Sequence, residues 1–158
     1  IRKNAPLDLE IEAFIHGSMV MSYSGRRLLS NYLTSRDAEK YDEEKHYNLV
    51  EEKRPGQYCP IYEDEGGTIF YAAKDLCMIE FIPDMIKSGV TTLTIEGNMK
   101  SNKYTEEVIK VYRKAIDEFI KSPDNWEFDK NWLEELQNID HRDLTTGFYL
   151  EENIDYIK

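Results

Sequence analysis

Residues 90–121, V-T-T-L-T-I-E-G-N-M-K-S-N-K-Y-T-E-E-V-I-K-V-Y-R-K-A-I-D-E-F-I-K, decide the fold class because a strand pattern leads directly into a helix pattern. Residues 90–95 are apolar or β-branched, which is typical of a strand. Ser101 or Asn102 can cap a helix that reaches about Lys121. Side chains close to the helical period predict one buried face on this helix: Tyr104, Val108, Val111, Tyr112, Ala115 and Phe119.

The alternation of strand and helix patterns extends over the rest of the chain. Residues 9–15 predict a strand that ends at His16 and Gly17, and an irregular insert follows it. Asp75 is expected to cap a helix that Pro83 interrupts. Further strands are expected at 47–50, 57–62 and 68–72, and further helical segments at 28–33, 84–88 and 131–137.

Alternating strands and helices favour a parallel sheet. The few strands of this chain do not make a well-covered α/β domain by themselves. The expected fold class is therefore α/β, and specifically the C-terminal part of a (β/α) TIM-like barrel with an irregular insert. The chain begins at Ile1 and leads at once into a strand, so we expect it to be part of a longer protein.

Composition restricts the classes of function. The net charge of -11 argues against a broad basic surface for nucleic acid, although it leaves room for a local basic pocket. The sequence contains neither an apolar run long enough to span a membrane nor a signal peptide pattern. Cys59 and Cys77 form neither a disulfide framework nor a metal-ligand spacing. These features predict a cytoplasmic protein without a membrane partner.

Three polar residues follow predicted strands at equivalent places. His16 follows F-I, Lys74 follows F-Y-A-A, and Glu96 follows L-T-I. The strands of a parallel barrel end at one mouth, where active sites lie, so we expect these three catalytic candidates to face one cavity. His16 would move a proton, Lys74 would hold an anion, and Glu96 would act as a base or pair with the lysine.

Each catalytic candidate also has a structural interpretation. A histidine after a strand is often a buried structural residue, Lys74 can simply precede a capped helix, and Glu96 can cap a turn. The segment Tyr23, Ser24, Gly25 and Arg26 is a candidate substrate-binding segment, because glycine permits close approach and arginine can bind a carboxylate or phosphate with two hydrogen bonds. The alternative for this segment is a tight turn with a solvated arginine.

Five segments together resemble the peptidase U32 family, in the order in which that family has them. They are H-G-S-M-V-M-S-Y-S-G-R-R-L-L-S-N-Y-L at 16–33, V-E-E-K-R-P-G-Q-Y at 50–58, K-D-L-C at 74–77, I-E-G-N-M-K-S at 95–101 and H-R-D-L-T-T-G-F-Y at 141–149. The resemblance implies a partial catalytic-type barrel domain at 1–122. It also implies an extension at 123–158 that leads toward a small domain outside this chain. Lys100 is a further candidate for substrate binding.

The resemblance also carries expectations about a cofactor. The hydroxylation branch of the family is thought to hold an iron–sulfur cluster on four cysteines. Two of these positions are Val20 and Arg27 here, and the other two belong in a cysteine-free stretch after Ala38. Thiolates hold such clusters, and neither valine nor arginine can replace one, so no cofactor is expected. Asn98 also replaces an arginine of the family motif.

The residues and the resemblance together leave three functions open. The first is a collagenase-like peptidase of the U32 type, which works without a cluster on a peptide substrate. The second is hydroxylation of tRNA or ribosomal RNA, in which tRNA-acting family members use prephenate as the oxygen source. The third is a non-catalytic relative that partners a cluster-bearing U32 paralogue. A homo-oligomer is a further expectation.

Overall fold

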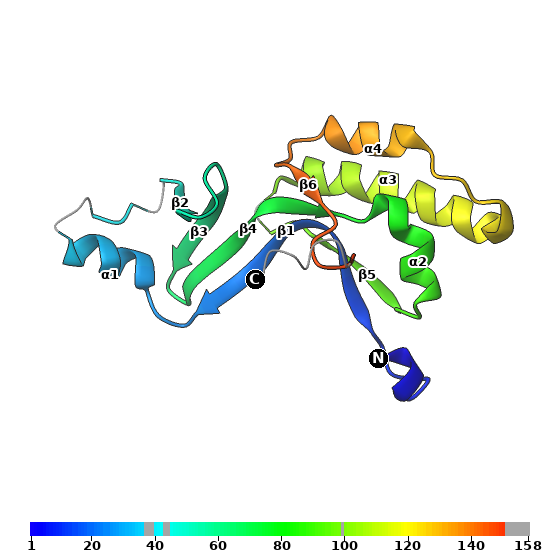
Figure 1. Ribbon diagram of the computed structural model, residues 1–158, viewed down its shortest axis with the longest axis horizontal. Helices are drawn as coiled ribbons and strands as arrows, with labels where there is room; N and C mark the ends of the chain where they lie inside the picture. The colour runs from blue at the N-terminus through cyan, green and yellow to red at the C-terminus, as the bar shows by residue number, and fades with distance from the viewer. Residues whose placement is uncertain (37–39, 43–44, 99, 151–158) are drawn as a thin grey trace. The chain divides into compact units, whose positions relative to one another are not determined.

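The computed structural model describes residues 1–36, 40–42, 45–98 and 100–150 (Figure 1). The charged stretch after Arg36 lies partly outside these residues. The described chain forms a mixed α/β structure with the following elements: η1 (Arg2–Asn4), β1 (Glu12–Ser24), α1 (Leu28–Ser35), β2 (Tyr47–Val50), β3 (Tyr58–Asp64), β4 (Gly67–Cys77), η2 (Ile79–Phe81), α2 (Ile82–Lys87), β5 (Thr92–Glu96), α3 (Asn102–Lys121), η3 (Pro123–Asn125), α4 (Lys130–Gln137) and β6 (Leu144–Thr145).

The chain divides into two compact units. Unit 1 comprises residues 1–17 and 75–158, and unit 2 comprises residues 18–74. Strands β1 and β4 contribute residues to both units. Within the described residues, one sheet has the order β2-β3-β4-β1-β5, and β6 pairs with β4 outside that path. The expected domains at 1–122 and 123–158 remain a prediction.

The strand directions differ between the two units. In unit 1, β1 pairs with β5 and β4 pairs with β6, and both pairs are parallel. In unit 2, β2, β3 and β4 pair antiparallel. The expectation of a parallel sheet is therefore confirmed in unit 1 and wrong in unit 2. For β3 and β4 the cause is the turn at Glu65 and Gly66, because so few residues can join only antiparallel strands.

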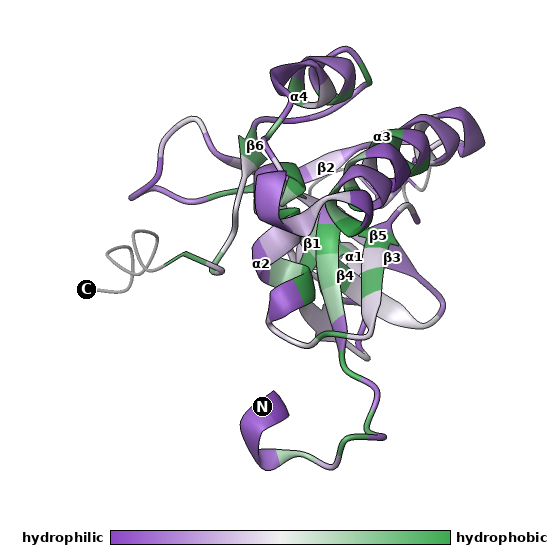
Figure 2. Ribbon diagram, turned by 90° about the vertical axis from the view of Figure 1, so that its right-hand side faces the viewer, coloured by the Kyte–Doolittle hydropathy of each residue, from purple (hydrophilic) through white to green (hydrophobic). Residues whose placement is uncertain are grey.

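Helix α3 contributes one buried face to the core of unit 1. Ser101 caps it, since the Ser101 hydroxyl accepts a hydrogen bond from the Tyr104 amide. Figure 2 shows hydrophilic residues along most of the length of this helix, with hydrophobic ones between them. The buried residues of α3 are the predicted ones: Tyr104, Val108, Val111, Tyr112, Ala115 and Phe119. Local periodicity was sufficient for this prediction.

Three local predictions were wrong. Strand β1 does not end at His16 and Gly17 but continues to Ser24. Gly17 lies within this strand with a positive φ of 109°, and glycine suits the position because a side chain there would clash with the carbonyl of Glu96. Asp75 does not cap a helix, because it lies inside β4 and is fully buried. Pro83 lies in the first turn of α2 and does not interrupt a helix.

Within the described residues, no helix is both long and apolar enough to cross a membrane.

Candidate functional site

The three predicted catalytic residues occupy different environments. His16 lies in β1 and is 2% exposed, whereas Lys74 is exposed on β4. Glu96 ends β5, and its carboxylate accepts a hydrogen bond from the Asn98 amide, so it caps a local turn. His16 and Glu96 belong to unit 1 and Lys74 belongs to unit 2. A joint site of the three remains a prediction.

His16 is held by a buried tyrosine. The Tyr112 hydroxyl lies 3.2 Å from Nδ1 of His16, accepts the Met78 amide and donates to the carbonyl of Ile15 at 2.9 Å. Since the tyrosine proton is directed to Ile15, Nδ1 of His16 carries the proton of its own hydrogen bond. Burial lowers the pKa of His16 to about 4, although the charge of Asp75 opposes this effect. His16 is therefore neutral at pH 7.

Asp75 is the buried anion of unit 1. Its Oδ1 accepts Nε and Nη2 of Arg142 at 3.0 and 2.5 Å, and its Oδ2 accepts the Arg142 amide at 3.1 Å. Nζ of Lys100 lies 3.4 Å from the same Oδ2. Burial by itself would raise the pKa of Asp75, but the hydrogen bonds and charge of Arg142, together with Lys100, lower it to about 2. Asp75 is therefore ionised at any physiological pH.

Tyr104 completes this cluster. It is 4% exposed, and among the described residues its hydroxyl has no hydrogen-bond partner. Nζ of Lys100 lies 4.9 Å from the centre of the Tyr104 ring, and the rings of Tyr104 and His16 are 6.0 Å apart. Burial raises the pKa of Tyr104 above its usual range, so the hydroxyl keeps its proton. A protonated phenol and an ammonium group thus lie beside a buried ion pair.

Four of the quoted sequence segments therefore meet in unit 1. His16 comes from the first segment, Asp75 from K-D-L-C, Lys100 from I-E-G-N-M-K-S and Arg142 from the last segment. Asp75, Lys100 and His141 lie close enough to His16 for their charges to act on its pKa. Of these residues, the sequence pattern indicated His16 and Lys100 as site residues, but not Asp75, Arg142, Tyr104 and Tyr112. One sequence feature could have indicated the ion pair: Asp75 and Arg142 both lie inside segments that resemble the family.

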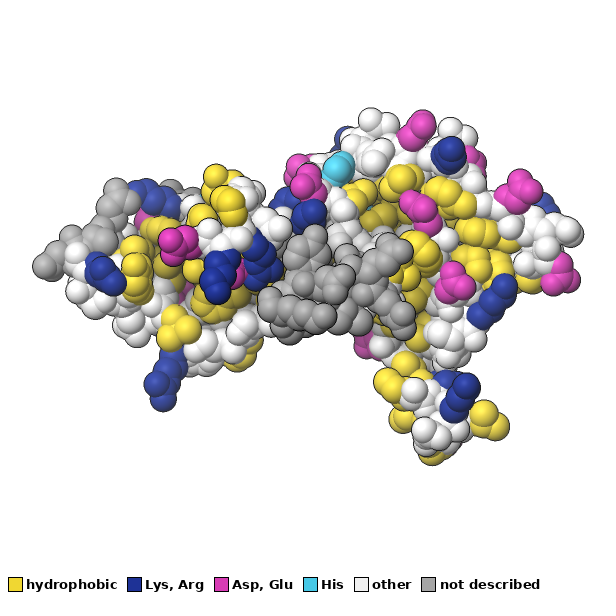
Figure 3. Space-filling view, viewed as in Figure 1, with side chains coloured by type: hydrophobic (Ala, Val, Ile, Leu, Met, Phe, Trp, Pro, Cys, Tyr) yellow, Lys and Arg dark blue, Asp and Glu magenta, His cyan; other side chains and the backbone are white. Residues whose placement is uncertain are grey.

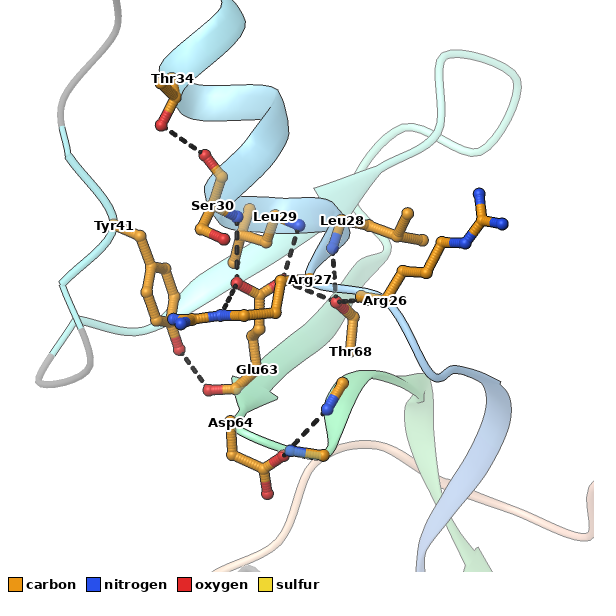
Figure 4. A network of polar contacts seen from close by, with 12 residues as sticks. Arg26, Arg27, Leu28, Leu29, Ser30, Thr34, Tyr41, Glu63, Asp64 and Thr68 are labelled. Atoms are coloured by element: carbon orange, nitrogen blue, oxygen red, sulfur yellow. Dashed lines mark hydrogen bonds and ion pairs between the residues drawn. The ribbon is translucent and has the colours of Figure 1, made fainter.

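The predicted substrate-binding segment lies in unit 2. Tyr23 and Ser24 end β1, and the Tyr23 hydroxyl donates to the carbonyl of Gly66 at 2.6 Å. The Ser24 hydroxyl accepts the amide of Arg26, so residues 24–26 form a local turn. In Figure 4, the Arg26 side chain extends away from the surrounding polar contacts. The structure thus supports both the turn and an exposed arginine.

Glu63 organises the start of α1 in unit 2. Its side chain is fully buried, and it accepts the amides of Leu29 at 2.8 Å and Ser30 at 3.1 Å and the hydroxyl of Thr68 at 2.6 Å (Figure 4). Nε of Arg27 lies 3.4 Å from the same carboxylate. Burial alone would raise the pKa of Glu63, but these hydrogen bonds lower it. Glu63 therefore acts as a buried cap for the helix.

The residues present do not fit a thiolate-held cluster. Val20 is 47% exposed on β1, and Arg27 pairs with Glu63. Cys77 is buried, its Sγ lies 3.7 Å from the Tyr112 hydroxyl oxygen, and burial raises its pKa. Throughout the part of the chain that the structure describes, no three His, Cys, Asp or Glu side chains are grouped to hold a metal ion. Neither an aliphatic side chain nor a guanidinium replaces a thiolate ligand.

The family comparison matches nearly the whole chain. The model described as peptidase family U32 matches residues 1–156. This range contains every segment on which the resemblance was based. No solved structure was found to match the chain.

Three relatives illustrate the similarity. The tRNA hydroxylation protein P1 of Bacillus subtilis is 41% identical, over 90% of this chain and 35% of its own length. The tRNA hydroxylation protein P2 of the same organism is 34% identical, over 98% and 51%. An uncharacterized protease of Methanocaldococcus jannaschii is 35% identical, over 95% and 37%. The chain thus spans between about a third and a half of the length of these relatives.

Proposed function

The chain belongs to peptidase family U32, and from this membership we propose that it takes part in the hydroxylation of tRNA. The observation that carries the proposal is the similarity to two relatives that are named tRNA hydroxylation proteins. Prephenate, which the resemblance implies as the oxygen source, is the proposed small substrate. The whole protein would have the barrel of which this chain supplies a part.

The surroundings of Cys77 and His16 in unit 1 argue against a cysteine peptidase built on these two residues. A cysteine peptidase needs a thiolate beside a histidine that can accept its proton. The Tyr112 hydroxyl contacts both Cys77 and His16, burial raises the pKa of Cys77, and burial lowers that of His16 to about 4. Both shifts oppose formation of a thiolate–imidazolium pair.

The cluster around Asp75 is the proposed centre of the site. Lys100 and Arg142 provide two positive charges for one buried carboxylate, and Tyr104 provides a protonated hydroxyl. Such donors suit a small anionic substrate. His16 is neutral and held by Tyr112, so at pH 7 it would help to position the substrate and would not transfer a proton. We also propose that the residues at the family's cluster positions hold no iron–sulfur cluster.

The test is mass spectrometry of tRNA nucleosides from a strain that lacks the gene. Loss of a hydroxylated nucleoside, restored by the wild-type gene but not by a gene that carries Lys100→Met, is the expected result. An unchanged nucleoside profile would overturn the proposal. Iron and sulfide analysis of the anaerobically purified full-length protein tests the cofactor proposal, and stoichiometric iron with sulfide would contradict it.

A peptidase is the second candidate, and the relative named as a protease favours it. Cleavage of gelatin or short peptides by the purified full-length protein, with metal added or removed, is its test. A non-catalytic partner of a cluster-bearing paralogue is the third candidate, which the side chains of Val20 and Arg27 favour. A pulldown from native extract that recovers a second U32 chain would support this candidate, and a pulldown that recovers none would count against it.

A further inference from the structure

The charge of unit 2 is locally segregated. Residues 13–36 contain Arg26, Arg27 and Arg36 but no aspartate or glutamate, although the chain has 31 acidic residues. The part of this segment in unit 2 forms the end of β1 and all of α1. In Figure 3, Lys and Arg side chains lie among hydrophobic ones on the surface formed by α1, β2 and β3. A basic patch thus exists on a strongly acidic protein.

Exposed tyrosine rings accompany these arginines. Tyr32 is 57% exposed, and the Arg36 guanidinium lies 5.4 Å from the centre of its ring. Leu28, Tyr32 and Arg36 follow one another at four-residue spacing, so they form an exposed stripe along α1. Tyr23 is 62% exposed, and its hydrogen bond to Gly66 holds its ring in place.

We propose that Tyr23, Arg26, Tyr32 and Arg36, here named the Tyr–Arg surface, bind single-stranded RNA. Aromatic rings stack on the bases of an unpaired strand, and arginines pair with its phosphates. Arg26 and Arg36 are both exposed, and Arg26 extends away from the Glu63 contacts (Figure 4). The proposal deepens the function proposed above, on which it rests, by naming where the RNA substrate contacts this chain.

The acidic residues near the Tyr–Arg surface indicate which of its residues the phosphates of the RNA would contact. Glu63 is fully buried against the start of α1 and does not face solvent. Asp64 is exposed and accepts the amides of Gly66 and Gly67, close to the hydroxyl of Tyr23. Phosphates are therefore expected at Arg26 and Arg36, and a base is expected at Tyr23.

An unpaired strand fits this chain better than a duplex. With a net charge of -11, the protein repels a polyanion at long range, so binding depends on a short contact with stacking. A duplex hides its base faces and would leave the exposed tyrosines unused. We therefore expect the affinity for an unpaired oligonucleotide to exceed that for a duplex of equal length.

Fluorescence anisotropy of a short labelled oligouridylate with the full chain tests the proposal. Tyr32→Ala is expected to weaken binding roughly tenfold without changing its salt dependence. Arg26→Ala and Arg36→Ala are each expected to weaken binding and to reduce the salt slope by about 0.7. Lys110→Ala, which removes an exposed lysine of α3, is the matched control and should change the affinity less than about twofold. Circular dichroism verifies that each variant is folded.

Three results would overturn the proposal: failure of the wild-type chain to bind the oligouridylate, equal losses for Lys110→Ala and Arg36→Ala, or competition by oligoglutamate as effective as that by unlabelled oligouridylate. The last result would assign the surface to an acidic protein. If tRNA nucleosides are unchanged in the deletion strain while Tyr32→Ala still loses binding, the surface stands and the proposed function fails. If nucleosides change while all variants bind normally, the proposed function stands and the surface fails.

Discussion

The guanidinium of Arg142 binds the carboxylate of Asp75 through Nε at 3.0 Å and Nη2 at 2.5 Å, and the side chain of Asp75 is fully buried. The two residues lie 67 positions apart in the sequence. Their ion pair ties β4 to the last described segment of unit 1. Because Lys100 approaches the same carboxylate, loss of the anion would leave two cations around an empty acceptor position.

Asp75→Asn is expected to lower the free energy of unfolding by about 3 to 5 kcal/mol, because removal of one partner leaves buried charge uncompensated. Urea titration at pH 7 measures this change. Asp117→Asn is the control, since Asp117 forms an exposed pair with Arg113 and should change stability by less than about 1 kcal/mol. Equal effects of the two substitutions would show that Asp75 contributes no more than a surface pair.

The pKa of His16 predicts a loss of stability in mild acid. Burial lowers this pKa from 6.5 to about 4. As the pH falls, the unfolded chain therefore takes up the proton first, so the stability that depends on neutral His16 is full above 6.5 and is lost between 6.5 and 4. Between pH 7 and pH 5 this loss amounts to roughly 2 kcal/mol.

Urea titrations of His16→Gln at both pH values test the prediction. The variant should lack this part of the pH dependence, because glutamine does not titrate but can still donate a hydrogen bond to Tyr112. His46→Gln, at an exposed histidine, should retain the wild-type difference. A wild-type pH dependence in His16→Gln would rule out a lowered pKa at this residue.

Sequence patterns correctly predicted the elements that depend only on residues close to one another in the sequence. The face of α3 follows from the spacing of its apolar residues, and the cap, which was expected at Ser101 or Asn102, is Ser101. Strand β2 at Tyr47–Val50 was likewise predicted. These features need no distant partner.

The site depends on partners that are distant in sequence, so residue patterns alone did not reveal it. Aspartate is a residue type that often caps helices. Asp75 lies inside a strand instead, where Arg142, 67 residues away, and Lys100, 25 residues away, stabilise its charge. Tyr112 was correctly predicted as buried, yet its contacts with Ile15 and His16 join residues that are 97 and 96 positions away in the sequence. Helical periodicity indicates which side chains are buried, whereas it does not identify the groups that a buried hydroxyl contacts.

Glu63→Gln is expected to weaken the start of α1. An amide group in place of the carboxylate presents N–H donors where Leu29, Ser30 and Thr68 all require acceptors. We expect a loss of about 2 kcal/mol or more in the local opening free energy. Hydrogen exchange of the Leu29 and Ser30 amides measures it. Glu65→Gln, at an exposed neighbour, should leave their exchange unchanged, and unchanged protection in Glu63→Gln would contradict the capping role.

Gly17→Ala tests the close approach of β1 to β5. A methyl group at residue 17 would lie 2.1 Å from the carbonyl oxygen of Glu96, and φ is 109° there, a value that alanine rarely adopts. Separation of the paired strands would be required, so we expect a loss of more than about 2 kcal/mol in urea titration. Gly25→Ala is the matched control, because a methyl group there meets no atom within 4 Å, and its effect should stay within about 0.5 kcal/mol. Comparable stability of the two variants would show that β1 and β5 do not pair closely at Gly17, and the path of β1 beyond His16 would then need revision.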